Sequence, residues 1–226
     1  QLARLNSAYA SQIERIHIPD FAIFIRDYYS QHRPVILQGG VDHWPALTQW
    51  CPQYFLDMVG DVAVEVQQGR DKDRLFERHS QQYRSKMPMR DFIVQIQQQE
   101  SSNNMYMTAN NAAQNVAGLS PLFQDIGNFG EGYTEQVQAS SRSFIWFGPK
   151  GTFTPLHHDL TNNMLVQVYG RKKVTLIPAL QTPYLYNDSG VYSEVDNPHD
   201  TSLIAQYPLL QQTSKLELVL HPGEAL

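Results

Sequence analysis

The spacing of apolar and polar residues predicts a mainly helical first part of the chain. Residues 2–16 have apolar positions at helical intervals. Asp20 suits a helix N-cap and precedes a second amphipathic stretch, residues 21–29. This second helix should end before Pro34, because the residue preceding a proline disfavours helical backbone. The continuous apolar run at 35–37 then predicts a short buried strand, followed by a turn.

The pattern alternates between helix and strand over the next hundred residues. Residues 53–59 have helical spacing, whereas 62–66 alternate as in a strand. Residues 89–99 again predict a helix, with Pro88 in its first turn, where the missing N–H costs nothing. Two longer stretches give no regular pattern: 103–132, rich in Asn, Gln and Gly, and 182–207, rich in Pro and Tyr, which predict loops and a long irregular insert.

The second half contains the most informative segment, residues 144–178. A turn-rich strand leads into Thr154-Pro155-Leu156-His157-His158-Asp159. Apolar residues at 164–169 and 174–178 then predict two strands joined by a turn containing Gly170, with Lys172 at the start of the second strand.

Composition and charge narrow the class of protein. The chain has 226 residues and is 42% hydrophobic and 11% aromatic, enough for a buried core in one large or two small domains. It has no apolar stretch of membrane-spanning length and no signal segment at its start, so no membrane partner is expected. A single cysteine, Cys51, excludes an internal disulfide and favours a cytoplasmic compartment, with the nucleus as the alternative in a eukaryote. The formal charge of −5 argues against non-specific nucleic-acid binding.

His157 and Asp159 are the candidate metal ligands. Residues i and i+2 of a strand face the same way, so both side chains can reach one ion. Two histidines and one carboxylate form the facial triad that leaves coordination positions open on non-haem Fe(II). A His-x-Asp triplet alone is weak evidence, because it also arises by chance as a hydrogen-bonded pair. The residues that follow it strengthen the interpretation.

The ordered set from 144 to 178 resembles the core of the JmjC, or cupin-like, hydroxylases, which use Fe(II), 2-oxoglutarate and O2. The resemblance implies that Thr154, Asn163 and Lys172 hold 2-oxoglutarate, and that Tyr106 on a preceding strand completes the pocket. It also implies a mainly β fold with helices: a double-stranded β-helix (jelly roll) at 104–226 with a helical and mixed cover at 1–103, in one domain.

These residue types suit the implied ligand. The distal carboxylate of 2-oxoglutarate is costly to bury without a partner, and Lys172 offers a positive charge while Thr154 and Tyr106 offer hydroxyl donors. The alternatives are a solvated turn lysine for Lys172 and a turn residue for Asn163, although the neighbouring Asn162 fits the turn role better. Arg171 and Lys173 flank Lys172 and should face the other way, into solvent.

The third iron ligand is missing from the pattern. The family places a histidine on an apolar strand after a Pro-Gly turn, and here Pro222-Gly223 is followed only by Glu224-Ala225-Leu226. His221 precedes that turn and is expected to be a strand-end residue, and His199 is expected at the surface. We therefore expect the third ligand, a histidine, beyond Leu226.

The sequence thus predicts an Fe(II)- and 2-oxoglutarate-dependent dioxygenase that hydroxylates a protein side chain. A histone-type demethylase and an RNA- or tRNA-modifying oxygenase would share the same catalytic residues. A cupin using another divalent metal would keep the His-Asp pair without needing Lys172, and an inactive binding module would need neither. The partner is expected to be a protein or peptide, with RNA as the alternative, and homodimer formation is left open.

Overall fold

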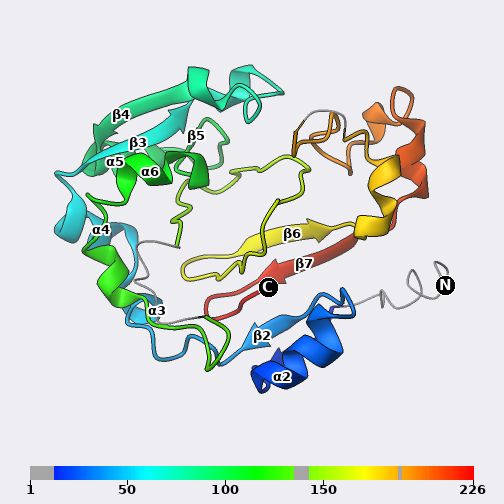
Figure 1. Ribbon diagram of the computed structural model, residues 1–226. Coiled ribbons are helices and arrows are strands. Elements are labelled where there is room, and N and C mark those ends of the chain that lie inside the picture. Colours follow the sequence, from blue (N-terminus) through cyan, green and yellow to red (C-terminus); the bar gives the residue numbers. More distant parts are fainter. Residues whose placement is uncertain (1–12, 135–142, 188–189) are drawn as a thin grey trace. The chain divides into compact units, whose positions relative to one another are not determined.

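A computed structural model describes residues 13–134, 143–187 and 190–226 (Figure 1). The described residues fall into two units, each interrupted in sequence. The first unit takes its residues from Gln1–Leu47, Asn128–Gln136 and Leu156–Leu226, and the second from Thr48–Gly127 and Val137–Pro155. The predicted organisation as one domain with a division at residue 103 stays a prediction.

The first unit has four short strands and several single-turn helices. The strands are β1 (Arg15–His17), β2 (Ile36–Gln38), β6 (Lys172–Leu176) and β7 (Leu216–Leu220). The helical segments are α2 (Phe21–Phe24), which continues as a π-helical turn (Ile25–Tyr29), and the 3-10 turns Ala179–Tyr184, Thr201–Leu203 and Pro208–Gln212. A further helix, α3 (Ala46–Gln49), spans the change from the first unit to the second.

Backbone pairing in the first unit joins segments that are far apart in sequence. β1 lies parallel to β2, and Leu37 of β2 forms an antiparallel bridge with Ala225. Ala225 in turn bridges Val166 on its other side. β6 and β7 are antiparallel neighbours, with Lys172 opposite Leu220 (Figure 1). The C-terminal residues are therefore a central part of this unit.

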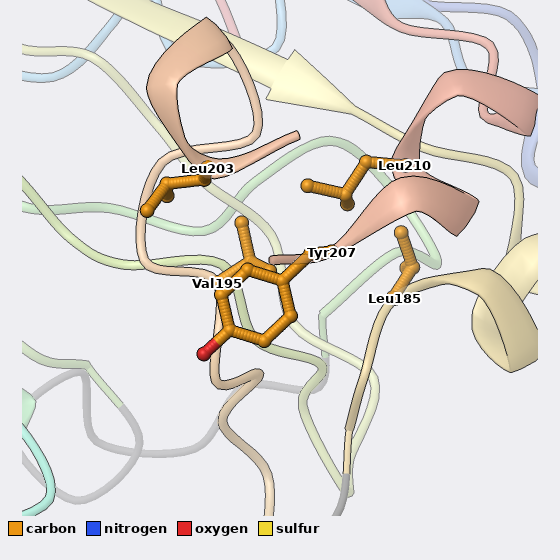
Figure 2. Packing of buried hydrophobic residues seen from close by; sticks show 5 residues of the cluster. All are labelled: Leu185, Val195, Leu203, Tyr207 and Leu210. Carbon is orange, nitrogen blue, oxygen red and sulfur yellow. The ribbon is translucent and has the colours of Figure 1, made fainter. Parts of the chain in front are cut away.

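Two apolar clusters contribute to the core of the first unit. One consists of Ile36, Leu218 and Leu220, which join β2 to β7. The other is formed by Leu185, Val195, Leu203 and Tyr207 of the segment predicted as an irregular insert and by Leu210, just after it (Figure 2). The insert is irregular in its backbone, as predicted, but it has an apolar core of its own.

The second unit is a three-stranded antiparallel sheet with helices. Its strands, in the order β4-β3-β5, are β3 (Ala63–Gln68), β4 (Arg84–Pro88) and β5 (Met105–Tyr106). Its helices are α4 (Pro52–Val59), α5 (Met89–Gln97) and α6 (Ala112–Asn115), with 3-10 turns at Arg70–Lys72, Ser80–Tyr83, Ala109–Asn111 and Leu122–Asp125.

Aromatic packing fixes the helices of the second unit. Phe55 of α4 and Phe92 of α5 both contact Phe147 edge-on, with ring centroids 5.2 and 5.7 Å apart respectively. Phe147 is held in place because its backbone forms an antiparallel bridge with Met107, just after β5. α4 begins, as its sequence predicted, next to Cys51, whose sulfur accepts a hydrogen bond from the Tyr54 N–H.

The structure corrects two sequence predictions. The helical spacing of 2–16 falls largely outside the described residues, but its last part is wrong, because Arg15–His17 is a strand paired with β2. The predicted hairpin of 164–169 with 174–178 is also wrong. β6 pairs with β7 instead, and Val166 pairs with Ala225.

Several other predictions are confirmed. The helix after Asp20 ends at Tyr29, before Pro34, although Asp20 makes no side-chain capping bond. The short strand after Pro34 is present and its first two residues are buried. α5 begins at Met89, directly after Pro88, although this proline occupies the N-cap position and not the first turn.

No helix in the described ranges has the length and apolar content needed to cross a bilayer, the longest α-helix having nine residues.

Candidate functional site

The proposed metal ligands lie on a backbone segment that is paired on one side. His157 forms an antiparallel bridge with Tyr192, and the N–H of His158 donates to the Val191 carbonyl at 3.0 Å. The N–H of Leu156 donates to the Asp196 carbonyl at 2.9 Å. The side chains of His157 and Asp159 lie near each other, as expected if residues two apart face the same way.

The two side chains approach one another closely enough to share a cation. His157 Nε2 lies 3.7 Å from Asp159 Oδ1. Bonds from a metal to imidazole nitrogen or carboxylate oxygen measure about 2.0–2.2 Å, so two donors on one ion lie roughly 3–4 Å apart. The side chains are 29% and 51% exposed, which leaves room for further ligands. The donor set therefore fits a divalent metal, and the His-Asp combination suits Fe(II).

Neighbouring residues orient both ligands. The His157 ring lies against Tyr192, with ring centroids 5.7 Å apart. The Asn163 side-chain amide donates to Asp159 Oδ2, which leaves Oδ1 turned toward His157. Hydrogen bonds of this kind fix the orientation of a metal-binding carboxylate. His158, between the two proposed ligands, is exposed.

No third ligand joins the pair within the described ranges, where no group of three His, Cys, Asp or Glu side chains could hold a metal ion. His221 follows the last residue of β7, as expected of a strand-end residue. His199 is exposed, with Nε2 3.0 Å from Thr175 Oγ1 and 3.2 Å from Glu217 Oε1. The histidine expected beyond Leu226 stays a prediction.

Lys172 begins β6, where the sequence placed it, and is half-buried. Its neighbours Arg171 and Lys173 are exposed, as expected. Lys173 forms an ion pair with Glu217 at 2.5 Å, and the hydrogen bond from Lys173 lowers the pKa of the Glu217 carboxyl. Of the three basic residues, Lys172 is thus the one whose side chain is partly withdrawn from solvent.

The predicted 2-oxoglutarate residues are divided between the two units. Asn163 and Lys172 belong to the first unit, together with His157 and Asp159, whereas Tyr106 and Thr154 belong to the second.

Asn162, the residue that better fitted a turn role, donates from its amide to the Tyr29 hydroxyl at 2.8 Å.

Tyr106 is buried, with 4% of its surface exposed, at the end of β5. Its ring meets the edge of Trp146, with centroids 5.6 Å apart, and its backbone is opposite Gln67 of β3. Thr154 is half-buried and follows Phe153, whose N–H donates to Asn103 Oδ1 at 2.9 Å. Both hydroxyl residues are thus held on ordered backbone within the second unit.

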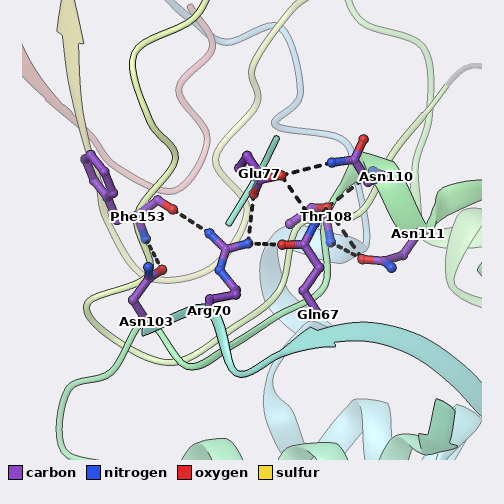
Figure 3. Close-up of polar contacts among 8 residues, drawn as sticks. All are labelled: Gln67, Arg70, Glu77, Asn103, Thr108, Asn110, Asn111 and Phe153. Atoms are coloured by element: carbon purple, nitrogen blue, oxygen red, sulfur yellow. Dashed lines mark hydrogen bonds and ion pairs between the residues drawn. The ribbon is translucent and has the colours of Figure 1, made fainter. Parts of the chain in front are cut away.

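A buried polar network lies beside these two residues and was missed by the sequence analysis (Figure 3). Arg70 is fully buried and forms an ion pair with Glu77 at 2.8 Å. Gln67, Thr108 and Asn110 extend the network by hydrogen bonds to one another or to Glu77. The available signal was local: β3 places Glu65 and Gln67 among valines, a pattern that in a buried strand requires polar partners.

The model of the cupin-like domain family matches residues 21–226. The chain belongs to the cupin-like domain family. The identification made from the ligand strand is thereby confirmed.

Named relatives of this cupin-like chain include JmjC proteins. Lysine-specific demethylase 8 of Danio rerio is 32% identical over 95% of this chain and 52% of the relative. Jumonji C domain-containing protein 5 of Drosophila melanogaster is 26% identical over 95% of the chain and 54% of the relative. tRNA wybutosine-synthesizing protein 5 of Homo sapiens is 27% identical over 90% of the chain and 66% of the relative. The chain spans about half the length of the curated relatives that it matches best.

The described residues contain both strands and helices, so the domain is mixed, and the predicted mainly β jelly roll stays a prediction. The strands form sheets of two and three strands, and a closed barrel is not detected in the described part of the chain.

Proposed function

We propose that this cupin-like protein is an Fe(II)- and 2-oxoglutarate-dependent oxygenase that hydroxylates a protein side chain. The observation that carries the proposal is the His157–Asp159 pair, two metal donors 3.7 Å apart on one face of an extended segment. The family membership supports it, as do relatives named as demethylases and as a tRNA-modifying protein. We also propose a jelly-roll core, which the antiparallel pairing of 156–158, 165–167 and β6 favours.

In this proposal, His157 Nε2 and Asp159 Oδ1 bind the iron, and a histidine expected beyond Leu226 completes the triad. When bound, iron and 2-oxoglutarate together supply the activation of O2 that C–H hydroxylation needs. The contribution of the chain is orientation. Tyr192 limits rotation of the His157 ring, and Asn163 holds the second oxygen of Asp159, so that both donors are positioned before the metal arrives.

Four residues are proposed to bind 2-oxoglutarate: Tyr106, Thr154, Asn163 and Lys172. Lys172 neutralises the distal carboxylate, and Tyr106 and Thr154 donate hydrogen bonds to it, since a carboxylate removed from water needs both charge and donors. The hydrogen bond from Asn163 to Asp159 gives Asn163 a second proposed task, because its amide can orient the metal ligand as well as meet the cosubstrate.

A protein substrate is favoured over RNA by the charge of the chain. The formal charge is −5, whereas proteins whose main task is nucleic-acid binding present a basic surface. Histone-type demethylation and hydroxylation proceed by the same hydrogen abstraction, so the present residues serve either. Cytoplasmic or nuclear location and homodimer formation stay predictions.

The proposal is tested with the full-length protein by calorimetry of 2-oxoglutarate binding in the presence of Mn(II), which keeps the oxygen-sensitive step silent. We expect saturable binding that requires the metal, and loss of binding in Asp159→Ala. Succinate release is then measured with Fe(II), O2 and either a lysine-containing peptide pool or tRNA.

Each outcome of the test has a distinct meaning. Metal binding without any 2-oxoglutarate affinity indicates a cupin that uses its metal for another reaction. Failure to bind either identifies an inactive binding module. Succinate release stimulated by tRNA and not by peptides would replace the protein substrate with RNA.

A further inference from the structure

We infer that Arg70 is a positioning residue for the 2-oxoglutarate site, because it fixes both Tyr106 and the backbone next to Thr154. The inference rests on the proposed function, in which these two residues donate hydroxyl hydrogen bonds to the cosubstrate. Its evidence lies wholly within the second unit, in contacts that converge on one guanidinium group (Figure 3).

The burial of Arg70 is the first part of the evidence. Its side chain is 0% exposed and that of its partner Glu77 is 3% exposed. A charge pair removed from water is costly and on its own adds little net stability compared with an apolar replacement. The carboxylate of the pair is nevertheless held by further bonds, since Glu77 Oε2 also accepts from Gln67 at 3.3 Å and from Asn110 at 2.9 Å. Such a pair is better explained by what it positions than by stability.

The second part is the contact between Arg70 and Tyr106. The guanidinium carbon lies 5.1 Å from the centre of the Tyr106 ring and 4.2 Å from that of Phe76. A planar cation between two aromatic faces restrains both rings. Tyr106 is confined from other directions by the edge of Trp146 and by Gly148, where an added Cβ would come within 2.7 Å of the tyrosine ring. Its ring therefore has little freedom to turn.

The third part is the contact between Arg70 and the strand that leads to Thr154. Arg70 Nη2 donates to the Phe153 carbonyl at 2.5 Å, and the Phe153 N–H donates to Asn103 Oδ1 at 2.9 Å. Both polar groups of this one residue are thus bound by side chains from elsewhere in the unit. Because Phe153 directly precedes Thr154, the clamp limits where the Thr154 hydroxyl can lie.

The shape of the arginine is what the arrangement requires. One nitrogen, Nη1, reaches Gln67 Oε1 and Glu77 Oε1 while Nη2 reaches Phe153, and the guanidinium carbon lies over the rings of Phe76 and Tyr106. Lysine has a single ammonium group and no plane, so it can replace the charge but not the simultaneous contacts. Arg70→Lys therefore keeps the charge but loses the simultaneous contacts, whereas Arg70→Met loses both.

The experiment measures 2-oxoglutarate affinity by calorimetry with Mn(II), together with Mn(II) affinity itself, in the full-length protein. A hydroxyl that no longer meets the carboxylate costs one charge-assisted hydrogen bond, which corresponds to about a tenfold loss. We expect 2-oxoglutarate affinity to fall by about tenfold or more in Arg70→Met and by a similar amount in Arg70→Lys, with Mn(II) affinity unchanged. In turnover, KM for 2-oxoglutarate should rise more than kcat falls.

Two further variants keep the inference testable if Arg70 variants do not fold. Asn103→Ala removes the other half of the clamp from a half-buried position and should weaken 2-oxoglutarate binding by a smaller factor. Ile93→Ala, in the buried face of α5, is the matched control. It should lower the melting temperature of the protein without changing 2-oxoglutarate affinity, so that destabilisation alone is separated from positioning.

The outcomes distinguish the inference from the proposed function. If Thr154→Ala and Lys172→Ala weaken 2-oxoglutarate binding but Arg70→Lys and Asn103→Ala leave it unchanged, the positioning role is wrong and the site assignment stands. If Thr154→Ala and Lys172→Ala also leave it unchanged, the assignment of the 2-oxoglutarate site is wrong, and the positioning role of Arg70 fails with it. If the wild-type protein itself binds no 2-oxoglutarate, the proposed function is wrong. If Ile93→Ala weakens binding as much as the clamp variants do, the effect is one of stability and the inference is refuted.

Discussion

Replacing Glu224 by Gln should destabilise the protein at neutral pH and have little effect in acid. The Glu224 carboxylate is buried at the C-terminal end and joins three segments of the first unit. Oε1 accepts from Arg15 Nε and Gln38 Nε2, each at 2.9 Å, and Oε2 accepts from the His221 N–H at 3.0 Å. All three partners are donors, so an amide NH2 at this position faces at least one donor that it cannot satisfy.

The expected magnitude follows from these bonds. A buried donor left without its acceptor costs about 1–3 kcal/mol, and a hydrogen bond to a charged group contributes about 1.5–3 kcal/mol. Gln keeps one carbonyl for Arg15 and Gln38 but loses the bond to His221, so we expect a loss of about 2 kcal/mol. For a chain of this size, that corresponds to a melting temperature lower by about 4–8 °C.

The pH dependence has a definite sign. Burial of the Glu224 carboxyl raises its pKa, but the hydrogen bonds from His221, Arg15 and Gln38 outweigh burial and leave the pKa lowered. A carboxyl whose folded-state pKa is lowered contributes stability above its unfolded pKa, about 4.3, and that contribution is lost as the pH falls through the folded value. Gln does not titrate, so the difference between wild type and variant should shrink as the pH falls below the unfolded pKa and through the lowered folded pKa.

Urea denaturation followed by circular dichroism across this pH range is the assay. Glu217→Gln is the control, since Glu217 is exposed and an ion pair in solvent, such as its pair with Lys173, adds little stability. A free-energy difference between wild type and Glu224→Gln that is absent at neutral pH, or that stays constant into acid, would refute the role assigned to this carboxylate.

Three further perturbations test other parts of the structure. Lys172→Ala should reduce 2-oxoglutarate affinity by more than about tenfold, because it leaves a carboxylate without its charge partner, whereas calorimetry should find Lys173→Ala nearly silent. Leu210→Ala should cost about 2–5 kcal/mol in urea denaturation, since Leu210 is 2% exposed in its cluster, and Leu209→Ala, at an exposed position, far less. Gly151→Ala should lower the melting temperature, because φ is +92° there and a side chain costs about 1–2 kcal/mol in that region.

The sequence predicted best where the signal is local. The two-residue spacing of His157 and Asp159 fixes their common face, and the Gly170 turn places Lys172 at the start of a strand. α4 and α5 were predicted nearly to their ends, α4 from the helical spacing of 53–59 and α5 from that of 89–99 after Pro88. Each of these features depends on neighbouring residues alone.

Long-range pairing could not be predicted from the pattern. The apolar run 164–169 does not indicate which segment it pairs with. Val166 pairs with Ala225, whereas the sequence predicted pairing with the strand that is now β6. Tyr192, which pairs with His157, lies inside the insert, whose apolar residues follow no regular period.

Polar partners were equally hidden. From the sequence alone, Arg70 would be taken for a surface residue, because arginine is seldom fully buried. It is buried here because the fold brings it a carboxylate from Glu77 and a carbonyl from Phe153.

Metal affinity of the ligand variants tests the central claim most directly. The full-length protein is titrated with Fe(II) or Mn(II) without oxygen, and His157→Ala, Asp159→Ala and the control His158→Gln are compared with wild type. Removing a direct ligand should weaken binding by more than about 100-fold, beyond the range seen for outer-shell residues, with unfolding unchanged, while the exposed His158 tolerates Gln. If either His157→Ala or Asp159→Ala binds metal as wild type does, this pair is not the metal site and the proposed function fails with it.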